Sequence, residues 1–240
     1  MFGAQKVHRK PVKQQKKEQL ESISSYLELT AVKLSCMIDV TRAIHNASPN
    51  WLGDTPVNYQ TPVRISSGAS ANVGSITMST HTGTHVDAPW HYDDKGLKLH
   101  EVPLETWVGT CVVVNAIGVS SLTPALLEDI DLTGITKVIF KTGQPNAWFE
   151  FPKTWAITDP SLPPYLAARG VNLIGTDAPS ADELTSKDLP GHQALAKAEV
   201  CILESLALEH VTPGKYRLIC LPLNLIGADG APARVILEAL

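Results

Sequence analysis

The sequence has no long apolar run, and no segment approaches the roughly 20 consecutive apolar residues that a membrane-spanning helix needs. The basic N-terminus is not followed by an apolar stretch either, so we expect neither a secretory signal nor a membrane partner. Two phosphate-binding motifs, G-x-G-x-x-G after a strand and G-x-x-x-x-G-K-[ST], are also absent. These absences argue against a membrane protein and leave a nucleotide-binding fold without support.

Cysteine is scarce, because the chain has only four, spread singly and without a C-x-x-C pair. Cys111, Cys201 and Cys220 lie in apolar runs of strand character, where a thiol acts as a small buried hydrophobic group. Reduced cysteines of this kind are typical of the cytoplasm, which is the location that we predict.

Charge is distributed unevenly along a chain whose formal net charge is −4 at pH 7. Residues 1–18 carry six Lys or Arg and one Glu, whereas the remainder is acidic. A basic segment can bind nucleic acid, which would make the protein a binding module rather than an enzyme. No aromatic side chains that could stack on bases alternate with the basic ones, so we expect no nucleic-acid partner. We interpret residues 1–36 as an N-terminal extension, either helical or disordered.

Residues 37–240 alternate between short β-rich runs and a few helical stretches. The runs with strand character are VGSITMST, GTCVVVNAI, KVIFKTG, VNLIGTD, VCILESL and YRLICLPL. Helical character is found in TPALLEDI, DPSLPPYLAARG and LPGHQALAKAE. Strands outnumber helices and the helices fall between them, so the pattern predicts one α/β domain with a mixed sheet.

The stretch HTGTHVDAPWH concentrates three histidines and an aspartate in an otherwise aliphatic region. His81, His85, Asp87 and His91 are separated by even intervals, which place side chains on one face of an extended chain. The glycine, threonines and proline among them argue against a helix. Mixed nitrogen and oxygen ligands suit zinc or a similar divalent metal, so the pattern predicts a metal site. No cysteine lies in the group, which argues against a structural zinc finger.

A catalytic pair of metals would need further ligands, including a carboxylate that can bridge them. His192 and Glu204 are the best remaining candidates. From the residues alone, however, a histidine near a helix start is more often a cap or surface group, and a glutamate after an apolar strand is often a solvated strand end. One straight helix would place the two residues about 18 Å apart. If both bind metal, the chain must therefore reverse between them, near Ala198 and Glu199.

HTGTHVDAPWHY resembles the H-x-G-[TA]-H-x-D-x-P-x-H signature of the metal-dependent cyclase-like amidohydrolases, and most closely that of the bacterial kynurenine formamidases. WLGDTP, TDAPSADELTSKDLPGHQAL and the C-terminal segment CILESLALEHVTPGKYRLICLPLNLIGADGAPARVIL are similar to further segments of that family. The resemblance covers about residues 37–240 and implies the cyclase-like swivelling β/β/α fold.

The resemblance also implies two zinc ions per subunit, with manganese or another divalent metal as an alternative. His81, His85 and Asp87 would hold the first ion. Asp87 would also reach the second ion, which His192 would bind, and Glu204 would bridge both. Each of these ligand types is present at its position in this sequence.

Two further roles follow from the resemblance. His91 would stay off the metals as the proton-transfer group, and Trp51 would contact the aromatic substrate. The sequence departs from the family at Gly191, before the histidine of the second site, and at Leu52, where a proline is frequent. Neither departure removes a ligand.

The activity that the resemblance implies is hydrolysis of N-formyl-L-kynurenine to L-kynurenine and formate in tryptophan degradation, by a homodimer. Metals lower the pKa of bound water from 15.7 toward about 7, which makes a nucleophile available. An imidazole with a pKa near 6.5 is suited to carry the proton to the departing aniline nitrogen. Hydrolysis of isatin or another cyclic amide is the alternative within the same superfamily.

Overall fold

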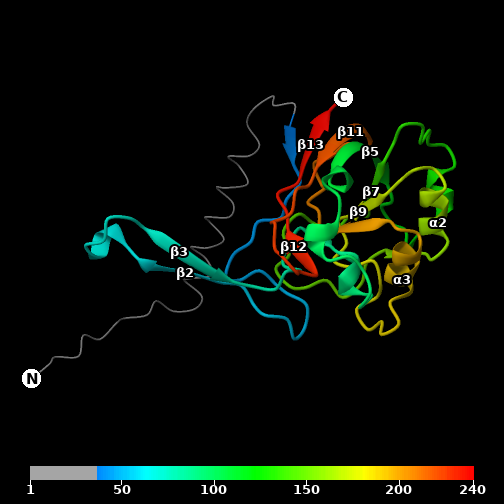
Figure 1. The fold of residues 1–240 in the computed structure, drawn as a ribbon. Coiled ribbons are helices and arrows are strands. Elements are labelled where there is room, and N and C mark those ends of the chain that lie inside the picture. Colours follow the sequence, from blue (N-terminus) through cyan, green and yellow to red (C-terminus); the bar gives the residue numbers. More distant parts are fainter. Residues whose placement is uncertain (1–36) are drawn as a thin grey trace, which may run out of the picture. The chain divides into compact units, whose positions relative to one another are not determined.

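In the computed structural model, which describes residues 37–240, nine strands form one mixed sheet (Figure 1). They are β1 (Met37–Asp39), β4 (His85–Asp87), β5 (Val108–Asn115), β7 (Lys137–Lys141), β9 (Leu173–Thr176), β10 (Cys201–Glu204), β11 (Gly214–Ile219), β12 (Gly230–Pro232) and β13 (Ile236–Ala239). Their order across the sheet is β1-β13-β11-β5-β7-β9-β10-β4-β12. The expectation for residues 1–36 lies outside the described residues.

The middle of the sheet is parallel and its flanks are antiparallel. β5, β7, β9 and β10 are parallel neighbours, and the strands on either side of them pair antiparallel. β9 and β10 are buried at every position, as expected for parallel strands covered on both faces. The expected α/β class with a mixed sheet is confirmed.

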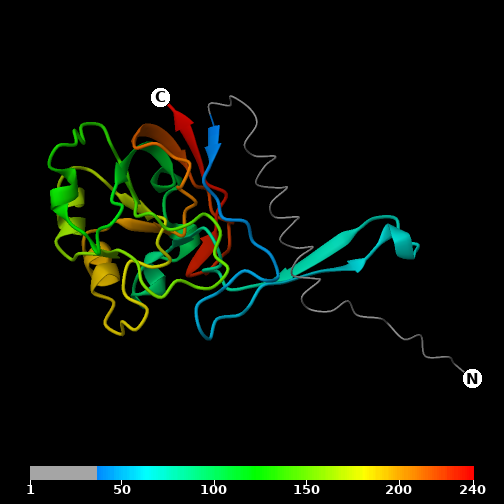
Figure 2. The same cartoon turned by 180° about the vertical axis from the view of Figure 1, so that it is seen from behind.

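Helices α2 (Leu162–Ala167) and α3 (Pro190–Lys197) cover one face of the sheet. Leu162 of α2 and Leu195 of α3 belong to the same apolar core as Val138 and Ile202 from the strands. Figures 1 and 2 both show the two helices next to each other. A second core, which includes Ile139, lies among strand and loop residues. No helix among residues 37–240 is long and apolar enough to cross a bilayer.

The helix expected in TPALLEDI is only a short 3-10 turn, Pro124–Leu127. Leu127 is the one buried residue of that turn, and Leu126 and Ile130 are only partly buried against the same core. The segment therefore buries too little apolar surface to stabilise a longer helix. The other two expected helices correspond to α2 and α3.

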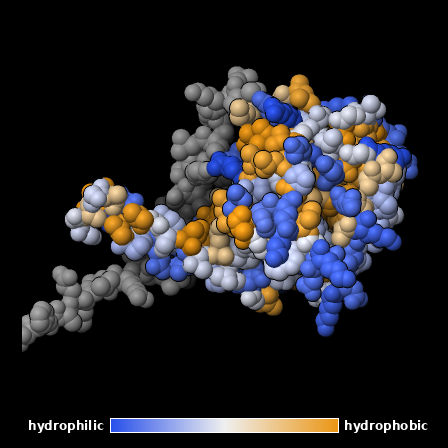
Figure 3. Space-filling model, in the orientation of Figure 1, coloured by the Kyte–Doolittle hydropathy of each residue, from blue (hydrophilic) through white to orange (hydrophobic). Residues whose placement is uncertain are grey.

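Two smaller strand pairs lie outside the main sheet. β2 (Asn58–Val63) and β3 (Val73–Thr77) form an antiparallel hairpin, and β6 (Ser121–Leu122) pairs with β8 (Ile157–Thr158). All residues of β3 and all but one of β2 are exposed. Several are large and apolar, and the surface of this hairpin is partly orange in Figure 3.

Candidate metal centre

His85, Asp87 and Glu204 come together because β4 and β10 are antiparallel neighbours. In this register His85 lies opposite Glu204, and Asp87 lies opposite Ile202. Residues directly opposite each other share a face of a sheet, and so do residues two apart on one strand. All three side chains are buried. One imidazole and two carboxylates therefore converge on one face.

His192 reaches the same place from α3. The helix ends at Lys197, and Glu199 adopts a left-handed conformation with φ 56° before β10 begins. The chain thus reverses where it must if His192 and Glu204 share a site. His192 Nε2 lies 3.8 Å from Glu204 Oε1.

Two imidazoles and two carboxylates alternate in this buried cluster. His85 Nε2 lies 3.4 Å from Asp87 Oδ1 and 3.5 Å from Glu204 Oε2. His192 Nε2 lies 3.6 Å from Asp87 Oδ2. Each carboxylate therefore presents one oxygen to each histidine, which is the arrangement that a pair of bridging carboxylates requires.

His81 and His91 join the cluster from outside the strand, which corrects part of the sequence interpretation. Only the segment His85–Asp87 is extended, because Gly83 with φ 65° turns the chain before it. A 3-10 turn, Pro89–His91, follows β4. His81 Nδ1 nevertheless lies 2.9 Å from Asp87 Oδ1, and the rings of His81 and His91 are 4.0 Å apart.

The second nitrogen of each cluster imidazole meets an acceptor. His85 Nδ1 lies 2.8 Å from the carbonyl oxygen of Gly83, and His192 Nδ1 lies 2.6 Å from Asp182 Oδ2. His81 Nε2 lies 3.0 Å from Asp229 Oδ2. Acceptors of this kind fix the tautomer and orientation of histidines that bind metals.

The residues present fit a metal centre. Asp87 Oδ2 is buried and has no hydrogen-bond partner in the described part of the chain. Burying a carboxylate oxygen without a partner destabilises the folded state unless the oxygen binds a proton or a cation. Ligand atoms of His85, Asp87 and Glu204 lie within 4.8 Å of one another, and those of His81, Asp87 and His91 do so as well. Asp87 belongs to both groups, as a ligand shared by two ions would.

The carboxylates control the pKa values of the buried imidazoles. Burial alone would lower the pKa of His85 and of His192, but hydrogen bonds and charge from neighbouring carboxylates outweigh burial and raise both to about 10. His81 responds in the same way, with a pKa of about 9. Burial would raise the pKa of Asp87, but the imidazoles hold it well below its usual range. Negative charge in the cluster thus strongly favours bound cations.

Asp182 and Asp229 contact the cluster and were not among the candidates from the sequence. Asp182 accepts hydrogen bonds from the backbone N–H groups of Gly191 and His192 at the start of α3. Its segment, SADE, contains two neighbouring carboxylates, which is the sequence signal for it. Asp229 follows an apolar run in the loop before β12, and no spacing links it to His81.

Trp51 is placed in an aromatic group beside the centre. Its ring lies 5.5 Å from that of Phe151 and 6.1 Å from that of Trp155. Trp155 Nε1 donates a hydrogen bond to the carbonyl oxygen of Asp182, which connects the aromatic group to the residue that holds His192.

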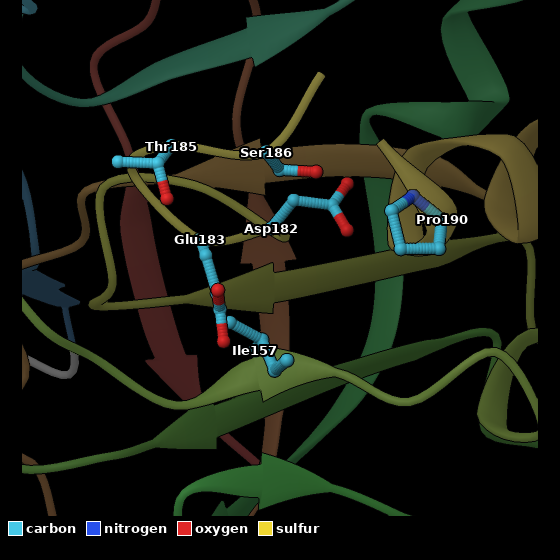
Figure 4. Close-up of a pocket in the computed structure, with 6 residues that line it drawn as sticks. All are labelled: Ile157, Asp182, Glu183, Thr185, Ser186 and Pro190. Carbon is cyan, nitrogen blue, oxygen red and sulfur yellow. The ribbon is translucent and has the colours of Figure 1, made fainter. Parts of the chain in front are cut away.

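A pocket of about 330 Å³ adjoins the same aspartate (Figure 4). It is lined by Ile157, Asp182, Glu183, Thr185, Ser186 and Pro190. None of the candidate metal ligands lines this pocket, so it lies beside the centre rather than over it.

Known proteins similar to this chain show the family to which it belongs. The family model for cyclases matches residues 38–183. The chain belongs to the cyclase family. It is 43% identical over 203 residues to a kynurenine formamidase from Geobacillus thermodenitrificans, which covers 85% of this chain and 97% of the relative.

Solved structures of the cyclase family share the fold. A protein from Bacillus stearothermophilus, described as a predicted metal-dependent hydrolase, is 30% identical with a TM-score of 0.71, over 84% of this chain and 97% of that one. Isatin hydrolase A from Labrenzia aggregata has a TM-score of 0.75 over 92% of this chain and 99% of its own, at 22% identity, and shows the fold alone. The resemblance stated from the sequence is confirmed, and so is the expected class of metal-dependent hydrolase.

Proposed function

We propose that the protein hydrolyses N-formyl-L-kynurenine to L-kynurenine and formate at a binuclear zinc centre. The observation that carries this proposal is the buried cluster in which Asp87 and Glu204 each face two imidazoles, one oxygen of Asp87 being without a hydrogen-bond partner in the described residues. The formamidase relative at 43% identity supports the substrate.

In this proposal His81, His85 and Asp87 would hold the first ion. His192 would hold the second ion together with Asp87, and Glu204 would bridge both ions. Metal ions bound there supply Lewis acidity, which makes water more acidic and polarises the formyl carbonyl. Asp182 and the carbonyl oxygen of Gly83 orient His192 and His85 from behind.

His91 is the residue that moves the proton in this proposal. Its side chain is about one third exposed, so it can meet both water and substrate, unlike the buried cluster residues. It takes the proton from the attacking water and delivers it to the aniline nitrogen as the C–N bond breaks. Trp51, in its aromatic group, contacts the substrate's aryl ring.

We further propose a homodimer that acts in the cytoplasm. The hairpin β2–β3 exposes Tyr59, Val63, Val73 and Ile76, and apolar surface of this kind marks contact sites between proteins. The buried free thiols of Cys111, Cys201 and Cys220 fit a reducing compartment. Light scattering on the protein as it elutes from a size-exclusion column tests the subunit number. A mass of two chains would support the homodimer, and a mass of one chain would contradict it.

Metal content and activity should be measured on one preparation. We expect two zinc ions per chain and faster turnover of N-formyl-L-kynurenine than of isatin. If isatin is hydrolysed faster, isatin or another cyclic amide is the substrate and N-formyl-L-kynurenine is not. A chain that binds no divalent metal would overturn the proposal as a whole.

A further inference from the structure

Asp229 lies between two histidines that have different parts in the proposed function. Its Oδ2 atom is 3.0 Å from Nε2 of His81 and 3.7 Å from Nδ1 of His91. The two rings themselves are only 4.0 Å apart and are tilted by 34°, so one carboxylate oxygen can serve both. Among the described residues, Asp229 is the carboxylate that lies within 4 Å of Nδ1 of His91, at 3.7 Å.

The backbone and side chain of Asp229 are both anchored. Its carbonyl oxygen accepts a hydrogen bond from the N–H of Ala88, the residue before the turn that carries His91. Its other carboxylate oxygen accepts one from the hydroxyl of Thr80 at 2.9 Å. The side chain of Asp229 is therefore bonded to Thr80, just before His81, and its backbone to Ala88, shortly before His91.

Gly230 permits this close approach. A Cβ atom at residue 230 would lie 2.6 Å from the carbonyl oxygen of Val86 and 3.0 Å from Cε1 of His81. Both distances are too short for a side chain, so glycine lets β12 press against β4. The approach places the preceding residue, Asp229, at the edge of the centre.

We propose that Asp229 is the positioning carboxylate of the proton-transfer histidine. It holds the proton of His91 on Nδ1, which leaves Nε2 as the nitrogen that exchanges a proton with water and the leaving group. The side chain of His91 is 33% exposed, which leaves its ring room for the small rotation that would shorten 3.7 Å to hydrogen-bond distance, while Asp229 stays anchored. The same logic of a carboxylate that sets the tautomer of a catalytic histidine operates in serine hydrolases. The inference rests on the proposed function only for the role of His91.

Nitrogen-15 NMR of the imidazoles tests the tautomer without any substrate. The zinc-loaded protein is compared with Asp229→Asn, and the His91 signals are assigned by their loss in His91→Ala. We expect neutral His91 to carry its proton on Nδ1 in the unaltered chain and to shift toward the Nε2 form in Asp229→Asn. An unchanged His91 tautomer in Asp229→Asn would overturn the proposal. If the unaltered protein hydrolyses no formylkynurenine, the proposed function fails while this result still stands.

A double-mutant cycle then separates His91 from His81. Asp229→Asn should lower kcat by roughly 10–10³-fold with KM little changed, and zinc should stay bound at saturating metal. In the His91→Ala background the same substitution should change kcat less than about threefold, because the residue it acts through is gone. Equal losses in both backgrounds, or loss of zinc, would show that Asp229 acts through His81 and would overturn the assignment. Asp131→Asn, at an exposed carboxylate paired with Lys215, is the matched control.

Discussion

Asp87 is a buried, charged residue, and one of its carboxylate oxygens has no hydrogen-bond partner in the described part of the chain. Its Oδ1 atom faces His81 and His85, and its Oδ2 atom faces His192 at 3.6 Å, beyond hydrogen-bond distance. The surrounding imidazoles stabilise the negative charge of this carboxylate, but its Oδ2 atom is left without a hydrogen bond. Cations between Asp87 and the imidazoles would bind this atom.

Asp87→Asn should empty the centre. Asparagine keeps the size of the side chain but removes its charge and replaces one carboxylate oxygen by an NH2 group, which cannot bind metal. We expect fewer than two ions per chain by elemental analysis and no measurable turnover, whereas Asp131→Asn should retain both. Full metal content together with lost turnover would make Asp87 a proton-transfer group instead of a ligand.

His91→Ala should separate metal binding from proton transfer. His91 is part of a cluster with His81 and Asp87 that could hold a metal, yet its side chain is more exposed, at 33% against 15% and 1%. We expect both ions to remain and kcat to fall by roughly 10²–10⁴-fold, the usual contribution of a positioned acid–base group. His192→Ala, measured alongside, should lose metal. An ion lost from His91→Ala would identify His91 as a ligand.

At the residue scale, the sequence predicts most of the candidate metal ligands but not the carboxylates that orient them. Even spacing predicts that His85 and Asp87 share a strand face, because that periodicity is local. His81 and Asp229 meet only because β12 pairs with β4, and no local pattern reports such pairing. The roles of the ligands stay predictions.

At the scale of elements, the start of α3 positions His192. Asp182 accepts from the N–H groups of Gly191 and His192 and from the imidazole, so one carboxylate caps the helix and aims the ring. Leu189 before the helix has φ 44°, a conformation that costs free energy for a residue with a side chain. The surrounding hydrogen bonds must hold it there.

Asp182→Ala should weaken both the fold and the centre. We expect the free energy of unfolding to fall by about 1–3 kcal/mol, from lost caps and an unpaired ring nitrogen. Metal affinity should fall by roughly 10–100-fold, as for other carboxylates that orient a metal-binding histidine. Denaturant unfolding and metal titration measure the two effects.

Asp159→Ala is the matched control for that substitution. Asp159 accepts hydrogen bonds from the N–H and the hydroxyl of Ser161 just before α2, and its side-chain hydrogen bonds in the described part of the chain do not involve the cluster. It should cost about 1 kcal/mol or less and leave metal affinity unchanged. Equal metal affinity in both variants would show that Asp182 serves the helix alone.

Element types are easier to predict than their extents. The apolar runs of β7, β9 and β10 identify buried strands because few other structures accommodate them. The segment TPALLEDI has helical residues but too little buried surface to lengthen beyond one turn. The length of this turn depends on its packing against residues that are distant in the sequence, so the local pattern does not predict it.

At the scale of the whole molecule, the family likeness and the described structure begin together, since the family model starts at residue 38. The formamidase relative aligns over 85% of the chain, and the sheet begins with β1 at Met37. Every candidate ligand lies after this point. The division into an extension over 1–36 and a domain over 37–240 stays a prediction.

A shortened chain that begins at Met37 tests this division. We expect it to fold, bind two metal ions and turn over N-formyl-L-kynurenine at a rate within about threefold of the full chain. The full chain, prepared in parallel, is the reference. A folded short chain that lacks activity would show that residues 1–36 contribute to the site or to the assembly.

Anomalous X-ray diffraction from crystals of the zinc-loaded protein, recorded on both sides of the zinc absorption edge, tests the central claim most directly. The account predicts two anomalous peaks that share Asp87 and Glu204. One should lie within about 2.0–2.2 Å of ligand atoms from His81 and His85, and the other at that distance from His192. No peak should lie at that distance from His91. A single peak, or a peak bound to His91, would contradict the assignment of a binuclear centre with a separate proton-transfer histidine.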